Sequence, residues 1–183
     1  MNILTTEERN MILIQGLDFF TASLSGIFVS VFIFINSDLR TTLFQLIIMN
    51  LSFLFFYMAS GWAFKKIQSS TLIKTSLATS MIYFLLLFYL KERVVQYIIP
   101  LSIFSGFGGG IYWAAFNLNQ YAFSNKESRV KYFGWSMAVL NAFQAVAPIL
   151  GGAIIAITGE RLFLGVKAGY SVLFLFVSLI YLL

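Results

Sequence analysis

The sequence predicts an all-α membrane protein with six transmembrane helices, and two features of the whole chain support that prediction. The first is composition: 60% of the 183 residues are hydrophobic, only 10% are charged, and the mean hydropathy is +0.88. Soluble domains carry about 25% charged residues, so this chain has too few to cover an apolar core in water. The second is spacing, because apolar runs of about 20 residues, the length that crosses a bilayer, alternate with short polar loops.

We expect one six-helix transmembrane domain over residues 1–183. The first helix closes at Asn36-Ser37, and either Asp38 or Thr41 is placed to cap the second helix. Lys65-Lys66 stops the second helix. The expected helices span about 11–35, 41–64, 71–90, 94–123, 132–158 and 162–183.

The remaining boundaries follow from charge, glycine and proline. The charged run 91–93 separates the third helix from the fourth, and the Gly-Glu-Arg run 159–161 separates the fifth from the sixth. Pro100 falls in the first turns of the fourth helix, which is longer than the hydrocarbon core requires, so we expect that helix to tilt or kink. The chain stops while the sixth helix is still apolar, so we expect it to be a piece of a longer protein.

The chain contains no cysteine and no histidine. Disulfides, thiolate nucleophiles, imidazole bases and the usual zinc and haem ligands are therefore excluded, and we expect no metal, no cofactor and no enzymatic activity. The formal net charge is +5, with the basic residues clustered in loops. Such loops are retained in the cytoplasm, so they indicate orientation and not nucleic-acid binding. Their distribution predicts a multi-pass protein of the cytoplasmic membrane with both termini inside the cell.

Asp18 is the only acidic residue inside an apolar run, and it shares a helical face with Thr21 and Ser25. One interpretation is a proton- or cation-sensitive carboxylate that lines an aqueous path. The other is an interfacial carboxylate without a functional role. On a different face of the same helix, the small residues Ala22, Gly26 and Ser30 repeat every four positions, a spacing typical of close helix packing.

Polar and aromatic residues also interrupt the fourth and fifth apolar runs. Tyr112 and Trp113 follow a glycine-rich stretch, and they either line a solute cavity or pack between helices. The amide groups either belong to the same path or form hydrogen bonds between helices. These amides belong to Asn117, Asn119, Gln120, Asn141 and Gln144.

The fifth helix carries a motif in which Pro148 is expected to kink the helix. The motif resembles the proline and paired glycines that the antiporters of the major facilitator superfamily carry in their fifth helix; its residues are Ala147, Pro148, Gly151 and Gly152. Four further residues resemble positions in the basic cytoplasmic loops of the same family: Gly61, Lys65, Lys66 and Arg129. Lys65 stands where an aspartate is expected in that family.

This resemblance covers the N-terminal six-helix half of such a transporter. It implies two inverted three-helix repeats and secondary active transport of a small solute by alternating access. The implied partners are the lipid bilayer, a small-molecule solute that is moved in a proton-coupled step, and either a missing C-terminal half or a second copy of the chain. The alternative function is that of a membrane scaffold or accessory subunit that does not transport.

Overall fold

The computed structural model describes residues 5–63, 66–124, 129–159, 162–163, 166–167 and 169–182. Almost all of these residues are helical. In chain order the elements are α1 (Thr6–Asn36), α2 (Leu39–Ala63), α3 (Ser69–Leu90), the 3₁₀ helix η1 (Lys91–Tyr97), α4 (Ile98–Phe123), α5 (Arg129–Thr158), β1 (Leu162–Phe163), β2 (Val166–Lys167) and α6 (Gly169–Ile180).

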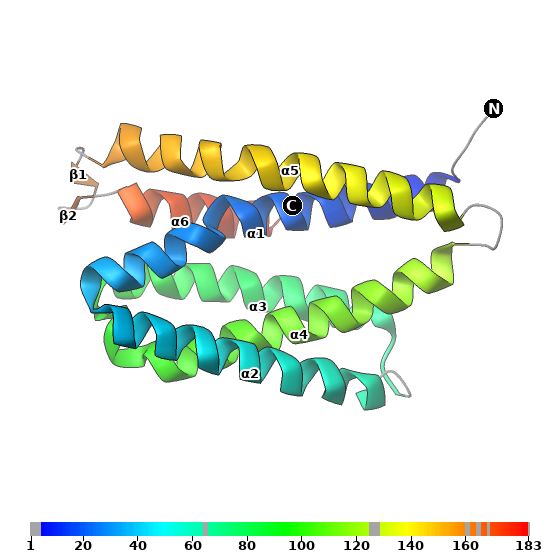
Figure 1. Ribbon diagram of the computed structural model, residues 1–183, viewed down its shortest axis with the longest axis horizontal. Helices are drawn as coiled ribbons and strands as arrows, with labels where there is room; N and C mark the ends of the chain where they lie inside the picture. The colour runs from blue at the N-terminus through cyan, green and yellow to red at the C-terminus, as the bar shows by residue number, and fades with distance from the viewer. Residues whose placement is uncertain are drawn as a thin grey trace.

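The helices form two layers (Figure 1). One layer contains α1, α5 and α6, and the other contains α2, α3 and α4. The two most extensive helix pairs are α2 with α4 and α1 with α5, and α3 packs against both α4 and α6. Successive helices run in opposite directions along the long axis, so the connections after α1, α3 and α5 lie at one end and those after α2 and α4 at the other.

The helix lengths agree with a membrane-spanning protein. By length and composition, four helical stretches are long and apolar enough to cross a membrane: Glu8–Asn36, Leu39–Ala63, Ser69–Ala122 and Arg129–Thr158. The third of these contains two antiparallel helices, α3 and α4, joined by η1. The described part of the chain therefore contains five long apolar helices, as expected of a helical membrane protein.

The sixth predicted helix is wrong in its first part. Residues 162–163 and 166–167 form a short antiparallel ladder, with Leu162 opposite Lys167 and Phe163 opposite Val166. The helix α6 begins only at Gly169 and has 12 residues, about 18 Å at the α-helical rise, which is shorter than the hydrocarbon core. Glycine disfavours a helix interior, and Gly165 and Gly169 both interrupt this run.

Two helix starts show how local sequence sets the boundaries. At α1, Glu8 N donates to Thr5 Oγ1 (3.2 Å) and Thr5 N donates to Glu8 Oε2 (2.8 Å), which forms a capping box that lengthens the helix beyond the predicted start. At α2, Thr41 N donates to Asp38 Oδ1 at 2.7 Å, so the predicted cap by Asp38 is confirmed. This hydrogen bond holds the pKa of the Asp38 carboxyl below its usual value.

Neither of the two prolines ends a helix. Pro100 is confirmed in the first turn of α4, where its missing N–H costs little, and η1 precedes it in place of the predicted helix start at residue 94. Pro148 lies inside α5, which continues through it to Thr158.

Glycines allow the two main helix pairs to approach closely. A Cβ built on Gly106 would lie 2.5 Å from the carbonyl oxygen of Met49 in α2. A Cβ built on Gly151 of α5 would meet the carbonyl oxygen of Leu24 and lie 2.6 Å from the Phe28 ring, both in α1. The same small-residue device therefore brings α4 against α2 and α5 against α1.

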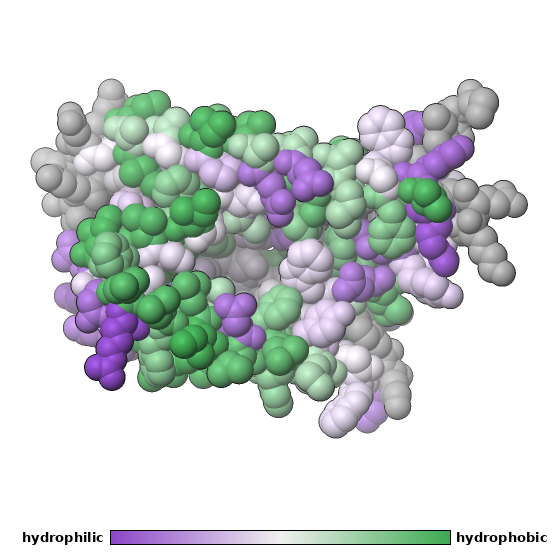
Figure 2. Space-filling model, viewed as in Figure 1, coloured by the Kyte–Doolittle hydropathy of each residue, from purple (hydrophilic) through white to green (hydrophobic). Residues whose placement is uncertain are grey.

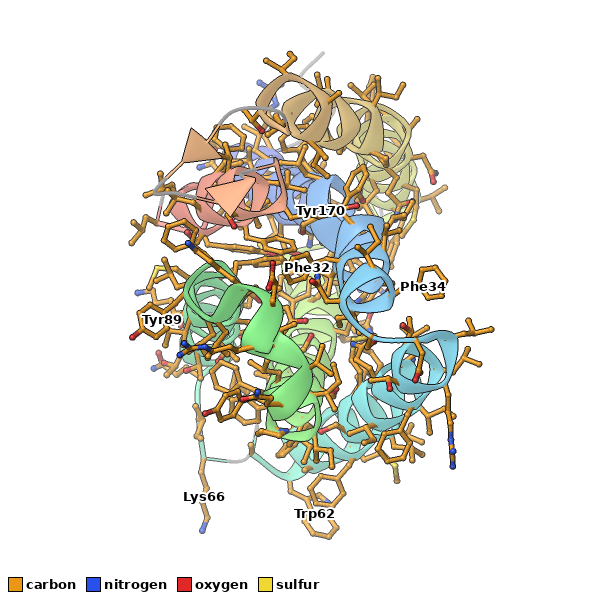
Figure 3. The ribbon with its side chains drawn as sticks, turned by 90° about the vertical axis from the view of Figure 1, so that its left-hand side faces the viewer. Phe32, Phe34, Trp62, Lys66, Tyr89 and Tyr170 are labelled. Carbon is orange, nitrogen blue, oxygen red and sulfur yellow. The ribbon has the colours of Figure 1, made fainter. Side chains whose placement is uncertain are left out.

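Aromatic side chains mark both the interior and the ends of the bundle (Figure 3). Phe32 and Tyr170 turn toward each other between α1 and α6, with ring centroids 5.3 Å apart. Trp62, which is 82% exposed, and Tyr89, which is 79% exposed, project away from the bundle at the ends of α2 and α3. Tryptophan and tyrosine at helix ends are typical of a membrane interface.

Candidate functional site

The polar face of α1 points into the protein. Thr21 and Ser25 are buried, and each hydroxyl donates to the carbonyl four residues earlier: Thr21 Oγ1 to Leu17 O at 2.7 Å and Ser25 Oγ to Thr21 O at 3.1 Å. Because these protons are used within the helix, the oxygens present lone pairs to their surroundings.

Asp18 lies deep in the bundle, between two tyrosines that are distant in sequence. Its carboxyl faces the hydroxyl of Tyr112 in α4 and that of Tyr181, just after α6. Protein atoms surround the carboxyl on nearly all sides, and the residue as a whole is half-buried. No cationic side chain of the described residues acts on it.

The Tyr112 hydroxyl is one of the two tyrosine hydroxyls that face Asp18. It is buried and has no hydrogen-bond partner at normal distance among the described residues, although the Asp18 carboxyl lies close enough to act on it. The Tyr181 hydroxyl similarly lies next to Ser80 of α3 as well as Asp18. Asp18, Tyr112 and Tyr181 therefore bring α1, α4 and the end of α6 together at one buried polar cluster.

A cavity of about 260 Å³ lies beside this cluster. Its wall is built by α1, α2, α3, α4 and Tyr181, and Figure 2 shows a hollow in the hydrophobic surface between the positions of α1 and α2. Each of the four helices contributes polar side chains. They are Ser25, Ser30, Gln45, Thr79, Ser80 and Ser105.

Gln45 is the most informative polar group of the cavity wall. It is 2% exposed, and its Nε2 reaches only the sulfur of Met49, at 3.7 Å. Its Oε1 is buried and has no hydrogen-bond partner among the described residues. A buried amide oxygen without a partner costs about 1–3 kcal/mol, and among the described residues only the Tyr112 hydroxyl shares this condition.

Ala22 and Gly26 of α1 also lie on this wall and not at a close helix contact, so the packing interpretation is wrong for them. No atom lies within 4 Å of a Cβ built on Gly26. The small side chains leave room for the cavity.

Trp113 belongs to the packed core more than to the cavity. Its ring meets the Phe19 ring edge-on at a centroid distance of 5.3 Å, and Tyr112 and Phe116 complete the same aromatic cluster. The packing interpretation therefore describes Trp113, while Tyr112 combines a packed ring with a hydroxyl that faces Asp18.

The amides of α4 form bonds between helices. Asn119 Oδ1 accepts from Ser69 Oγ at 2.6 Å, and Asn117 Nδ2 donates to Tyr57 Oη at 3.2 Å. Gln120 Nε2 donates to Ser136 Oγ at 3.4 Å. The hydrogen-bond interpretation therefore describes all three, and none of them is among the residues that line the cavity.

The chain from Gln120 continues across the bundle. Ser136 Oγ donates to Gln15 Oε1 at 2.9 Å, and Gln15 Nε2 donates to Tyr132 Oη at 3.4 Å. Gln15, Tyr132 and Ser136 are buried, so this network joins α1, α4 and α5 inside the bundle. The sequence pattern did not predict this network.

Asn141 and Gln144 lie on the exposed surface of α5, away from the cavity wall. Figure 2 shows hydrophilic side chains over the middle of α5, surrounded by hydrophobic surface. The structure therefore does not bring these two amides together with Asp18, and polar groups at this depth of a membrane helix need a partner other than lipid.

The proline motif of α5 packs against α1. Ala147 is fully buried in the main core, Gly151 crosses α1 beside Leu24, and Gly152 approaches the Phe28 ring. Pro148 is half-buried beside them.

Of the four predicted loop residues, the structure describes three. Gly61 is exposed on the last turn of α2, Lys66 extends from the bundle in Figure 3, and Lys65 lies outside the described residues. Arg129 donates from Nε to Ser124 Oγ (3.0 Å) and from Nη2 to Ser124 O (3.1 Å), and its guanidinium lies 4.5 Å from the centre of the Tyr121 ring. Arg129 thus holds the C-terminal end of α4, where a cation is favourable.

Comparison with known proteins gives one distant relative. The sequence is similar to a protein of Geobacillus stearothermophilus described as "Uncharacterized protein in sodM 3'region", with 26% identity over 159 residues, which cover 85% of this chain and 71% of the relative. No protein-family model matches the sequence. No solved structure matches it.

Proposed function

We propose that the chain is a six-helix half of a secondary transporter of the major facilitator type, which moves a small solute across the cytoplasmic membrane by alternating access. The observation that carries the proposal is the cavity between four apolar helices, to which each helix contributes polar side chains, with Asp18 close to its wall at Tyr181. Polar and ionisable groups inside a membrane bundle are costly and are typical of substrate or ion pathways.

The helix pairing supports the same proposal. In two inverted three-helix repeats, α1 corresponds to α4 and α2 corresponds to α5, so a contact of α1 with α5 has α4 with α2 as its counterpart. These are the two most extensive helix pairs, and glycines mediate both crossings. The proposal retains α6 as the short third helix of the second repeat, and it places both termini in the cytoplasm.

A scaffold or accessory role is the second candidate, and the exposed amides of α5 favour it. Asn141 and Gln144 require a polar partner within the membrane. The same surface fits the missing half of a transporter or a second copy of the chain, so a partner at α5 is common to both candidates.

Solute counterflow in liposomes separates the two candidates. The purified full-length protein is reconstituted and preloaded with members of a solute panel, and exchange of one labelled solute is expected. Gly26→Phe should abolish exchange, because the new ring enters the cavity where no atom lies within 4 Å of the Cβ position. Gly61→Phe adds the same ring to open, exposed surface on the last turn of α2, away from the cavity and from α5, and should leave exchange intact. Absence of exchange across the panel would favour the scaffold.

A further inference from the structure

The exposed amides of α5 lie where lipid cannot satisfy them. Asn141 and Gln144 are exposed near the middle of this 30-residue helix, and Figure 2 shows hydrophilic side chains over this part of α5 amid hydrophobic surface. No hydrogen bond joins either amide to another group in the described part of the chain. Each amide has two N–H donors and one C=O acceptor, and hydrocarbon supplies a partner for none of them. The partner of this surface must therefore offer both donors and acceptors at the same depth.

The face of α5 that carries Asn141 has small side chains and points away from the protein. Ala138, Asn141 and Ala145 are exposed and are separated by three and four positions. This spacing places them along one narrow stripe, like the seam between two helices packed about 20° apart. Small side chains in such a seam let two membrane helices approach closely. The buried face of the same helix carries Tyr132, Ser136, Leu140, Ala147 and Gly151.

The amide in this stripe makes the face complementary to itself. A two-fold axis along the membrane normal brings Asn141 of two copies to the same depth, where each amide can donate to the oxygen of the other. Two copies of one sequence insert in the same orientation, because the same basic loops are retained inside. No charged residue occurs from Tyr132 to Thr158, so the two faces meet without like-charge repulsion.

From these properties we propose that α5 is the contact surface between two copies of this chain, which pair in parallel along the stripe of Ala138, Asn141 and Ala145. Asn141 fixes the register of the pair, as a single asparagine does in the seam of a coiled coil. Gln144 flanks the stripe, and none of the three stripe residues lines the cavity. The proposal rests on the proposed function for the need of a partner at α5 and deepens it by naming that partner.

Cysteine cross-linking tests the contact, and the sequence contains no other cysteine. The full-length protein is expressed at low density and oxidised in its own membranes, and dimers are measured on non-reducing gels. Ala138→Cys and Ala145→Cys should form dimers, because the close seam brings the paired Cα atoms within the distance of about 7 Å that a disulfide requires.

Two further positions on α5 are the controls for cross-linking. Val146 and Ala153 are also exposed, but at 3.6 residues per turn they lie about 80–100° around the helix from Ala145. Val146→Cys and Ala153→Cys should therefore remain monomeric. Dimers that form equally fast at the control positions, or no dimers at Ala138→Cys and Ala145→Cys, would overturn the proposal.

Identical substitutions of two exposed amides test the role of Asn141. Asn141→Leu should weaken dimerisation about 10-fold, measured by energy transfer between labelled copies at increasing lipid-to-protein ratios. Asn50→Leu removes an exposed amide of α2, whose Nδ2 donates to Leu46 O at 2.7 Å, and should leave dimerisation unchanged. Asn141→Gln keeps the donor and the acceptor and should retain the dimer. Equal dimerisation of the parent and Asn141→Leu, or equal weakening in both leucine variants, would contradict the proposed contact.

The outcome is separable from the transport function. Dimers cross-linked through α5 without counterflow of any solute would retain this interface and reject transport. Counterflow by a protein that forms no cross-links through α5 would retain transport and reject a second copy as the partner.

Discussion

Gly110 of α4 lies against the backbone of Phe53 in α2, so closely that a Cβ built on the glycine would stand 2.6 Å from the Phe53 carbonyl oxygen. Such a separation is too short for non-bonded carbon and oxygen, and the obstacle is backbone that cannot rotate away. The α2–α4 pair, which forms one wall of the cavity, therefore requires glycine at this position.

Gly110→Ala should accordingly separate α2 from α4 and destabilise the protein by about 1–3 kcal/mol, the usual cost of overpacking. Gly134→Ala is the matched control, because no atom lies within 4 Å of its Cβ position and alanine favours a helix by about 0.5–1 kcal/mol. Thermal unfolding in one detergent, followed by helical circular dichroism, measures both. An equal shift of the melting temperature in the two variants would mean that the close contact of α2 with α4 at Gly110 does not contribute to the stability of the protein.

Asp38 gives a prediction about acid stability. The backbone N–H of Thr41 donates to its carboxylate and lowers its folded-state pKa, while the unfolded value is about 3.9. A lowered folded pKa contributes stability that is present above the unfolded pKa and is lost as pH falls through the folded pKa. The parent should therefore lose melting temperature as the pH falls from about 5 to below 4.

The variant Asp38→Asn keeps a capping oxygen without the titrating charge, so this part of the acid dependence should disappear. Asp38→Ala should lower the melting temperature at all pH values because it removes the cap as well. If the parent and Asp38→Asn lose stability in parallel with acid, the Thr41–Asp38 bond does not set the acid response.

Cysteine labelling tests the proposed orientation, and the natural sequence contains no cysteine to interfere. Ser70 lies at the end of the bundle that holds the α2–α3 connection, and Ser37 lies at the opposite end, between α1 and α2. In intact cells an impermeant thiol reagent should label Ser37→Cys and spare Ser70→Cys, because basic loops stay inside. Labelling of Ser70→Cys alone would invert the orientation while retaining the fold.

Patterns within single segments of the sequence predicted the long helices well. They failed where a helix boundary depends on contacts with other segments. Apolar length located the first five helices within a few residues. The capping box of Thr5 and Glu8 was visible in the sequence as a Thr-x-x-Glu pattern and would have corrected the start of α1. The start of α6 was missed because the run 162–169 is apolar enough to resemble a helix, although glycine interrupts it twice.

The candidate site was predictable only in part. Helical periodicity correctly put Thr21 and Ser25 on the same side as Asp18, but it could not say which helices would face them. Tyr181 reaches the cavity because the short helix α6 ends at Ile180, midway along the bundle, a boundary that only the structure reveals. A usable signal existed in α3, where Ser76, Thr79, Ser80 and Tyr83 follow the i, i+3, i+4, i+7 pattern of one face.

Asp18 provides the most direct test of coupling. A charge at the centre of a membrane helix costs about 2.5–3.5 kcal/mol on insertion scales, and asparagine would avoid that cost while keeping a similar shape. The carboxyl lies between the hydroxyls of Tyr112 and Tyr181, and Tyr181 is part of the cavity wall, so a proton taken up at Asp18 would change the charge directly beside the solute site. Asp18→Asn should therefore preserve folding and solute counterflow, which needs no net proton movement, and abolish uptake driven by a pH gradient.

Asp38→Asn is the matched control for this experiment, because it makes the same chemical change in an exposed loop outside the helices. Proteoliposomes with an imposed pH gradient and equal amounts of each variant measure uptake, and counterflow without a gradient is measured in the same preparation. Loss of gradient-driven uptake in Asp18→Asn alone assigns proton coupling to this carboxyl. Gradient-driven uptake that is unchanged in Asp18→Asn would reduce Asp18 to a buried polar residue that only packs against its two tyrosines.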